Sequence, residues 1–149
     1  MAARTPTTRG SAFSWRILGA VVLGGAIGVA LRALLVLPVA ESDSWIVLPA
    51  VTLAVNIAGS FALGVVVGLW DDRRPLARAF VGTGVLGGFT TYSAFAVQVG
   101  EVGALAPVTG LLLAAIAVFV GLVAAALGLR IGRSAAGDPA RREPPEDAE

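Results

Sequence analysis

The segment GGFTTYSAF, from Gly87 to Phe95, places two glycines and four hydroxyl side chains inside an apolar run. Each glycine costs a helix about 1 kcal/mol relative to alanine, and the β-branched threonines add to that cost. We therefore expect a helix to break within this segment. If the run crosses a membrane, the freed backbone groups must be satisfied by protein or by a bound ion. Thr90 or Thr91 is expected to cap the second half of the helix, and the carbonyls of the broken turn suit a hard cation.

The composition is that of a membrane protein. Of the 149 residues, 56% are hydrophobic and 14% are charged, and the mean hydropathy is +0.84. Cysteine and histidine are absent and all 11 basic residues are arginine, which excludes disulfides, imidazole acid–base catalysis and metal cages built from these residues. The net charge of +1 is too small to suggest a nucleic-acid partner.

Four segments reach the roughly 20 apolar residues that a spanning helix needs. They cover residues 17–39, 45–70, 78–99 and 104–129. The first is longer than the apolar part of a typical signal peptide, so we interpret it as a retained helix. Residues 1–16 and 134–149 have little to bury and are expected to be disordered tails. The sequence thus predicts an all-α membrane protein, with four transmembrane helices over residues 17–133 and a break in the third.

Small residues mark the helix faces that are expected to pack together, because the hydrophobic effect does not drive helix association in lipid. They recur at Ala20, Gly24 and Gly28, at Ser60, Gly64 and Gly68, and at Ala114, Gly121 and Gly128. Two polar residues need a further explanation. Arg32 should face protein or water, either in an anion or structural contact or by snorkelling to the interface. Asn56 is expected to form an interhelical hydrogen bond or to line a pore.

Tyr92 and Phe95 are three residues apart after the expected break and therefore share a helix face. The edge of an aromatic ring is electropositive, so two rings offer an anion a weakly attractive wall that does not trap it. Core packing is the ordinary explanation for aromatic residues at this spacing. The neighbouring break makes an anion pathway a serious alternative.

Three stretches of the chain resemble the small fluoride channels of the Fluc or CrcB family: GGAIGVALR (24–32), TLAVNIAGSFALG (52–64) and GTGVLGGFTTYSAF (82–95). The resemblance implies an antiparallel dimer with two pores that exports fluoride passively across the cell membrane and so relieves its toxicity. It also implies a structural sodium ion at the dimer interface, held by the main-chain carbonyls of Gly87 and Thr90. The implied fluoride pathway is lined by Asn56, Tyr92, Ser93 and Phe95.

The chain departs from the family pattern in its third and fourth helices. The family usually reads TTFSTF followed by Ser, an apolar residue and Glu, whereas this chain reads TTYSAF followed by Ala, Val and Gln98. The fourth helix usually carries several hydroxyl residues, whereas Thr109 is the only one between residues 104 and 129. Whether one subunit alone lines a complete pathway therefore stays open.

Two functions from other classes compete with the channel. A small multidrug exporter is also a four-helix dimer, but it needs a carboxylate inside the membrane. The acidic residues between the predicted helices fall in loops: Glu41, Asp43, Asp71, Asp72 and Glu101. A non-transporting accessory subunit would explain the small-residue faces but not the broken helix or Asn56. An enzyme is not expected, because no helix carries a nucleophile–base pair or an acidic dyad.

The arginines predict the orientation of the chain. All except Arg32 lie on the same side of the four predicted helices: Arg4, Arg9, Arg16, Arg73, Arg74, Arg78, Arg130, Arg133, Arg141 and Arg142. The positive-inside rule then places both termini in the cytoplasm. An antiparallel homodimer must insert both ways, so this bias favours a heterodimer with a homologous, oppositely oriented subunit. A homodimer is the alternative.

Overall fold

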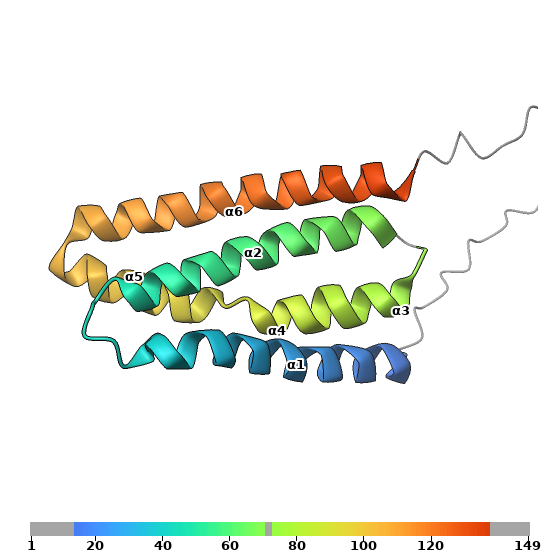
Figure 1. Cartoon of the computed structure of the whole chain (residues 1–149), viewed down its shortest axis with the longest axis horizontal. Helices are drawn as coiled ribbons and strands as arrows, with labels where there is room; N and C mark the ends of the chain where they lie inside the picture. The colour runs from blue at the N-terminus through green and yellow to red at the C-terminus, as the bar shows by residue number, and fades with distance from the viewer. Residues whose placement is uncertain (1–13, 71–72, 138–149) are drawn as a thin grey trace, which may run out of the picture.

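The computed structural model describes residues 14–70 and 73–137, and these residues are all-helical (Figure 1). Four segments are long and apolar enough to cross a membrane: α1 (Trp15–Ala40), α2 (Val47–Trp70), a third segment (Pro75–Leu105) and α6 (Pro107–Ala136). The predicted four-helix architecture is confirmed. The predicted tails lie mostly outside the described residues, and their inner ends, at 15–16 and 134–136, belong to α1 and α6.

The third segment is broken, as predicted. It consists of α3 (Pro75–Arg78), the π-helix η1 (Ala79–Leu86), α4 (Gly87–Phe89) and α5 (Tyr92–Leu105). The break falls at Thr90 and Thr91, whose backbones are extended, with φ, ψ of −80°, 152° and −148°, 110°. The glycine pair before it is helical. Gly88 serves packing instead, because a Cβ there would overlap the Gly25 carbonyl oxygen on α1.

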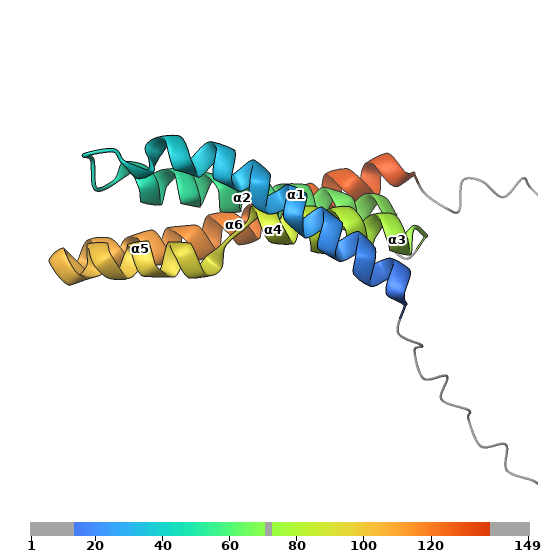
Figure 2. The same ribbon diagram turned by 90° about the horizontal axis from the view of Figure 1, so that it is seen from below.

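The helices pack through their small residues, as expected. α2 lies along α6, while α1 packs against η1 and α4 (Figures 1 and 2). A Cβ on Gly128 of α6 would lie 3.0 Å from the Val65 nitrogen of α2 and would overlap the Phe61 carbonyl. α1 and α5 do not stay together along their length. Figure 2 shows them separating toward the end of the bundle that carries the α1–α2 connection.

Two predicted boundaries are wrong. Residues 100–103, predicted as a loop, continue α5 to Leu105, so Glu101 lies on a helix. The chain reverses at Ala106 alone, since Pro107 opens α6 and keeps the preceding residue out of the helical region. The fourth helix also extends beyond residue 129, so Arg130 and Arg133 lie on the last turns of α6 instead of after it.

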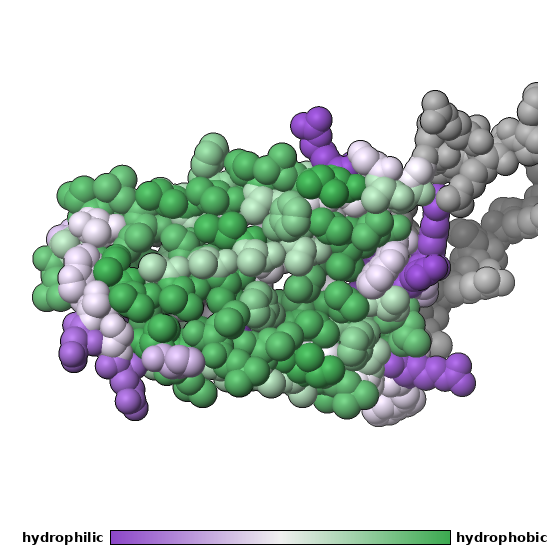
Figure 3. All heavy atoms as spheres, in the orientation of Figure 1, coloured by the Kyte–Doolittle hydropathy of each residue, from purple (hydrophilic) through white to green (hydrophobic). Residues whose placement is uncertain are grey.

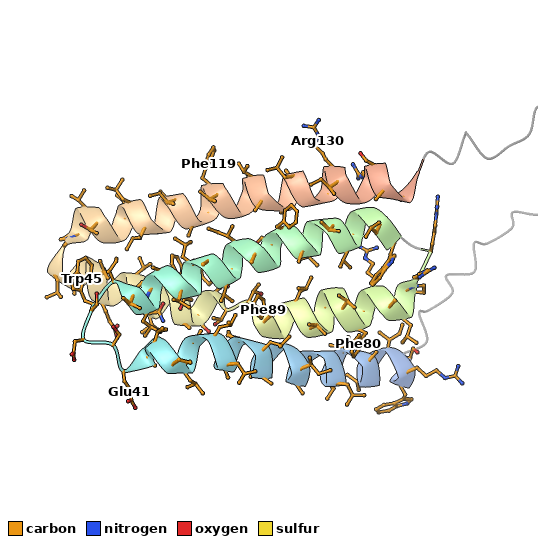
Figure 4. The ribbon with its side chains drawn as sticks, viewed as in Figure 1. Glu41, Trp45, Phe80, Phe89, Phe119 and Arg130 are labelled. Atoms are coloured by element: carbon orange, nitrogen blue, oxygen red, sulfur yellow. The ribbon has the colours of Figure 1, made fainter. Side chains whose placement is uncertain are left out.

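Charged side chains gather toward the two ends of the bundle and leave an apolar band between them (Figure 3). Glu41 and Trp45 lie at the end that carries the α1–α2 connection, whereas Arg130 points outward from α6 nearer the opposite end (Figure 4). An apolar band with polar ends is the expected surface of a chain that crosses a bilayer several times.

Candidate functional site

The helix break is held by Asn56 of α2. Its Nδ2 donates to the Thr91 carbonyl at 3.0 Å, and its Oδ1 accepts from the Thr91 N–H at 2.8 Å. The amide therefore satisfies both backbone polar groups of Thr91, which the break leaves without helical partners. The interhelical hydrogen bond, one of the two roles expected for Asn56, is present.

The hydroxyl groups of both threonines at the break form hydrogen bonds with backbone atoms. Thr91 is the N-cap of α5, since its Oγ1 accepts from the Ala94 N–H at 3.3 Å. Thr90 Oγ1 donates to the Leu86 carbonyl at 3.0 Å, the same carbonyl that accepts the Thr90 N–H. The predicted cap is thus confirmed, and Thr91 is the residue that provides it.

A groove of about 540 Å³ opens beside the break. Its lining brings together five of the predicted site residues: Asn56, Gly87, Thr90, Tyr92 and Phe95. The wall that α6 contributes is apolar and consists of Ala117, Val118, Gly121 and Leu122. None of the described residues that line the groove is charged, and its polar lining residues are Asn56, Ser60, Thr90 and Tyr92.

A second recess, of about 530 Å³, lies between α1 and α5. Its lining includes Arg32, Thr91, Ser93, Gln98 and Glu101. The Arg32 Nε and the Gln98 Oε1 are buried here, and neither atom has a hydrogen-bond partner among the residues that the structure describes. Arg32 therefore lines an open recess that also contains the polar side chains of Thr91, Ser93, Gln98 and Glu101.

Ser93 was predicted on one pathway with Asn56, Tyr92 and Phe95, but the structure separates it from them. It is exposed in the Arg32 recess, where its Oγ lies 3.4 Å from the Thr91 Oγ1. The break itself stands between the two hollows, with Thr90 on the groove and Thr91 on the recess. Within one chain Ser93 lines the recess and not the groove, and its place on the fluoride pathway stays a prediction.

Gln98 and Glu101 were not among the predicted site residues. Gln98 is 9% exposed, which is unusual for an amide without a partner. The signal in the sequence is its position seven residues after Thr91, which places both on one face of α5. Glu101 follows Gln98 by three residues and continues the same face.

The described residues contain no group of three or more acidic side chains that could hold a metal ion. The remaining candidates are backbone carbonyls at the break. Gly87 and Thr90 both line the groove, and a Cβ built on Gly87 would meet nothing within 4 Å, so this stretch of backbone is open on the groove side. Such carbonyls suit an alkali cation.

Residues 19–129 match the sequence model of a family described as CrcB-like protein, Camphor Resistance (CrcB). Among the relatives is fluoride-specific ion channel FluC 2 of Bacillus subtilis, 37% identical over 124 residues, which are 82% of this chain and 92% of that protein. FluC of Idiomarina loihiensis is 43% identical over 99 residues, 64% of this chain and 73% of that protein. FluC 2 of Leifsonia xyli is 46% identical over 84 residues, 52% of this chain, and the match covers only 56% of that protein. The family match includes every residue of the groove and of the Arg32 recess.

Proposed function

The chain belongs to the CrcB family, also called Fluc, and from this membership we propose that it is a subunit of a fluoride-selective channel that lets fluoride leave the cytoplasm passively. It is a multi-pass membrane protein and a channel subunit rather than an enzyme. The observation that carries the proposal is the uncharged groove at the helix break, where Asn56, Tyr92 and Phe95 meet.

The groove offers an anion several weak contacts in place of one strong contact. The ring edges of Tyr92 and Phe95 are electropositive, and one N–H of the Asn56 amide remains after its bond to Thr91. Without a full positive charge, an ion can shed its water and still leave. The guanidinium of Arg32, in the recess on the other side of the break, attracts anions to that mouth of the pathway.

A second subunit completes the groove. A single chain leaves the groove open on one side. The part of α6 that lines the groove carries no polar side chain. In a bilayer the open side would present Asn56 and Thr90 to lipid, which is unfavourable for polar groups. We propose an antiparallel dimer in which the polar residues of one subunit face the apolar α6 wall of the other.

The orientation follows from the arginines. Within the described residues, five exposed arginines lie toward the end of the bundle opposite the α1–α2 connection: Arg16, Arg73, Arg74, Arg130 and Arg133. We propose that this arginine-rich end faces the cytoplasm and that both termini lie there. Because the bias is strong, the partner is a homologous subunit with the opposite bias. A homodimer is the competing arrangement.

The cation that the family implies is sodium, bound at the dimer interface by the carbonyls of Gly87 and Thr90. The donor set supports this assignment, because neutral carbonyl oxygens suit a hard monovalent cation. When bound, the ion would supply a fixed charge that stabilises the broken helices of two subunits. Neither residue needs its side chain for this role.

The other two functions lack support at the site. An exporter requires a carboxylate where its substrate binds, whereas the described lining of the groove carries none. Glu101 is exposed near the end of α5, in the other recess. An accessory subunit gives no reason for the hydrogen-bonded break.

The test is fluoride efflux from liposomes that contain the purified chain, measured with a fluoride electrode. A channel releases fluoride down its gradient and retains chloride under the same conditions. Liposomes with the chain alone, and with a homologous subunit added, separate the homodimer from the heterodimer. Release of neither ion in both preparations would contradict the proposal.

A further inference from the structure

Two backbone donors at the break are diverted from the acceptors that a continuous helix would give them. In an α-helix the N–H of residue i donates to the C=O of residue i−4. The Thr91 N–H would therefore donate to the Gly87 carbonyl, but it donates to the Asn56 Oδ1 at 2.8 Å. The Ala94 N–H would donate to the Thr90 carbonyl, but it donates to the Thr91 Oγ1 at 3.3 Å.

We propose that Asn56 and Thr91 are positioning residues that keep the carbonyls of Gly87 and Thr90 available to a cation. Each takes the one N–H that would otherwise occupy one of these oxygens. The assignment of sodium as the cation rests on the proposed function, whereas the diversion of the two donors does not. Neither side chain needs to touch the ion.

The bonds around Asn56 fix which way its amide points. Its Nδ2 donates to the Thr91 carbonyl at 3.0 Å, so the Oδ1 is left to accept the Thr91 N–H. Reversing the amide would set donor against donor and acceptor against acceptor. Asn56 is therefore held as an acceptor for this N–H, and the Gly87 carbonyl stays clear of it.

Thr90 is fixed by two independent contacts. Its Oγ1 and N–H both bond to the Leu86 carbonyl at 3.0 Å, which turns the side chain back along α4. Its methyl group sits over Gly59, where a Cβ would overlap it. The Thr90 side chain is thus engaged with α4 and α2, and Thr90 is one of the residues that line the groove.

The experiment measures sodium binding through stability. Thermal unfolding of the purified protein in detergent is followed over a sodium series, with N-methyl-glucamine replacing sodium at constant ionic strength. A ligand that binds only the folded protein raises the unfolding temperature with its concentration. Thr91→Val removes the oxygen that takes the Ala94 N–H but keeps the shape of the side chain. Asn56→Ser removes both bonds to Thr91.

Both variants are expected to need about tenfold more sodium than the wild-type protein for the same rise in unfolding temperature. Thr91→Ser keeps the hydroxyl and should restore the wild-type sodium dependence. Thr83→Val is the matched control, because it removes the hydroxyl of an exposed threonine on η1. A wild-type sodium dependence in Thr91→Val overturns the proposal. If that variant does not fold, a wild-type sodium dependence in Asn56→Ser overturns it.

Fluoride efflux from the same preparations separates this inference from the proposed function. A wild-type protein that conducts fluoride but shows no sodium-dependent stability overturns the positioning role and leaves the channel intact. A protein that fails to conduct but shows the expected shifts in both variants supports the positioning role and contradicts the channel.

Discussion

Tyr92 and Phe95 line the same groove from successive turns of α5, yet the Tyr92 side chain is 80% exposed and the Phe95 side chain is 5% exposed. Phe95 is held by its own subunit, whereas Tyr92 projects toward whatever occupies the groove. The two rings therefore differ in their support: Phe95 is packed within the chain, whereas Tyr92 would become packed only in the proposed dimer.

Phe95→Ile is expected to abolish fluoride efflux while the protein still folds. The substitution keeps an apolar group of moderate size, so it should destabilise the fold by less than the about 3–5 kcal/mol of a change to alanine. It removes the electropositive ring edge. Efflux from liposomes, with size-exclusion chromatography to show assembly, measures both effects. Wild-type flux in assembled Phe95→Ile would exclude a role for the ring in the pathway.

Tyr92→Phe is the matched change at the exposed position. It keeps the ring and its edge and deletes only the hydroxyl, so efflux should stay within about a factor of two of the wild-type rate. The same liposome assay measures it. A loss as large as that of Phe95→Ile would assign the contact to the hydroxyl group instead of the ring.

Arg32→Gln should slow efflux by about tenfold, because the guanidinium attracts anions to the recess at one mouth of the proposed pathway. Raising the ionic strength should lower the wild-type rate toward that of the variant. Arg16→Gln removes a charge that is exposed at the start of α1 and should leave the rate unchanged. Equal effects of the two changes would mean that net charge matters and the recess does not.

Gly128→Val should destabilise the protein by about 2 kcal/mol or more, because a Cβ there overlaps the Phe61 carbonyl across the α2–α6 contact. Gly100→Ala is the control on α5, where a Cβ meets nothing within 4 Å. It should stabilise the helix by about 0.5–1 kcal/mol. Thermal unfolding in detergent gives both values. Similar melting temperatures for the two variants would contradict the close packing.

Fluoride flux should not depend on the sodium gradient, since the proposed sodium ion is structural. Efflux is measured with sodium in excess inside, outside or on both sides of the liposome. Equal rates are expected. A rate that follows the sodium gradient would identify a coupled transporter.

Reporter fusions test the orientation. A C-terminal reporter that is active only in the cytoplasm should give signal, and one that is active only outside it should give none. Signal from both, together with efflux from the chain purified alone, would identify a homodimer that inserts in both directions.

The sequence predicts the four helices and the broken segment because long apolar runs and paired threonines act locally. It does not predict that Gly88 packs against Gly25, since the cost of glycine in a helix is outweighed there by a close helix contact. The predicted loop at 100–103 fails for a related reason, because Gly103 and Gly110 approach closely enough for α5 to continue to a one-residue reversal.

At the site, the roles of Asn56 and Thr91 follow from local chemistry: an amide in an apolar helix needs a partner, and a threonine before a helix caps it. Which atoms Asn56 and Thr91 bond depends on the relative position of α2 and α5. The same position therefore decides which backbone carbonyls remain without a hydrogen-bond donor. The separation of Ser93 from the groove has the same origin, because the direction of α5 after the break is set by its contacts with α2 and α6.

The groove beside the break has a consequence for how much of this protein a cell can hold. A subunit with an empty groove would expose Asn56 and Thr90 to acyl chains, an arrangement that disfavours the isolated chain. In the proposed heterodimer its folded abundance should therefore be limited by the supply of the partner subunit. Raising the gene dosage of this chain alone would then yield surplus copies that proteases remove, whereas a homodimer would supply its own partner.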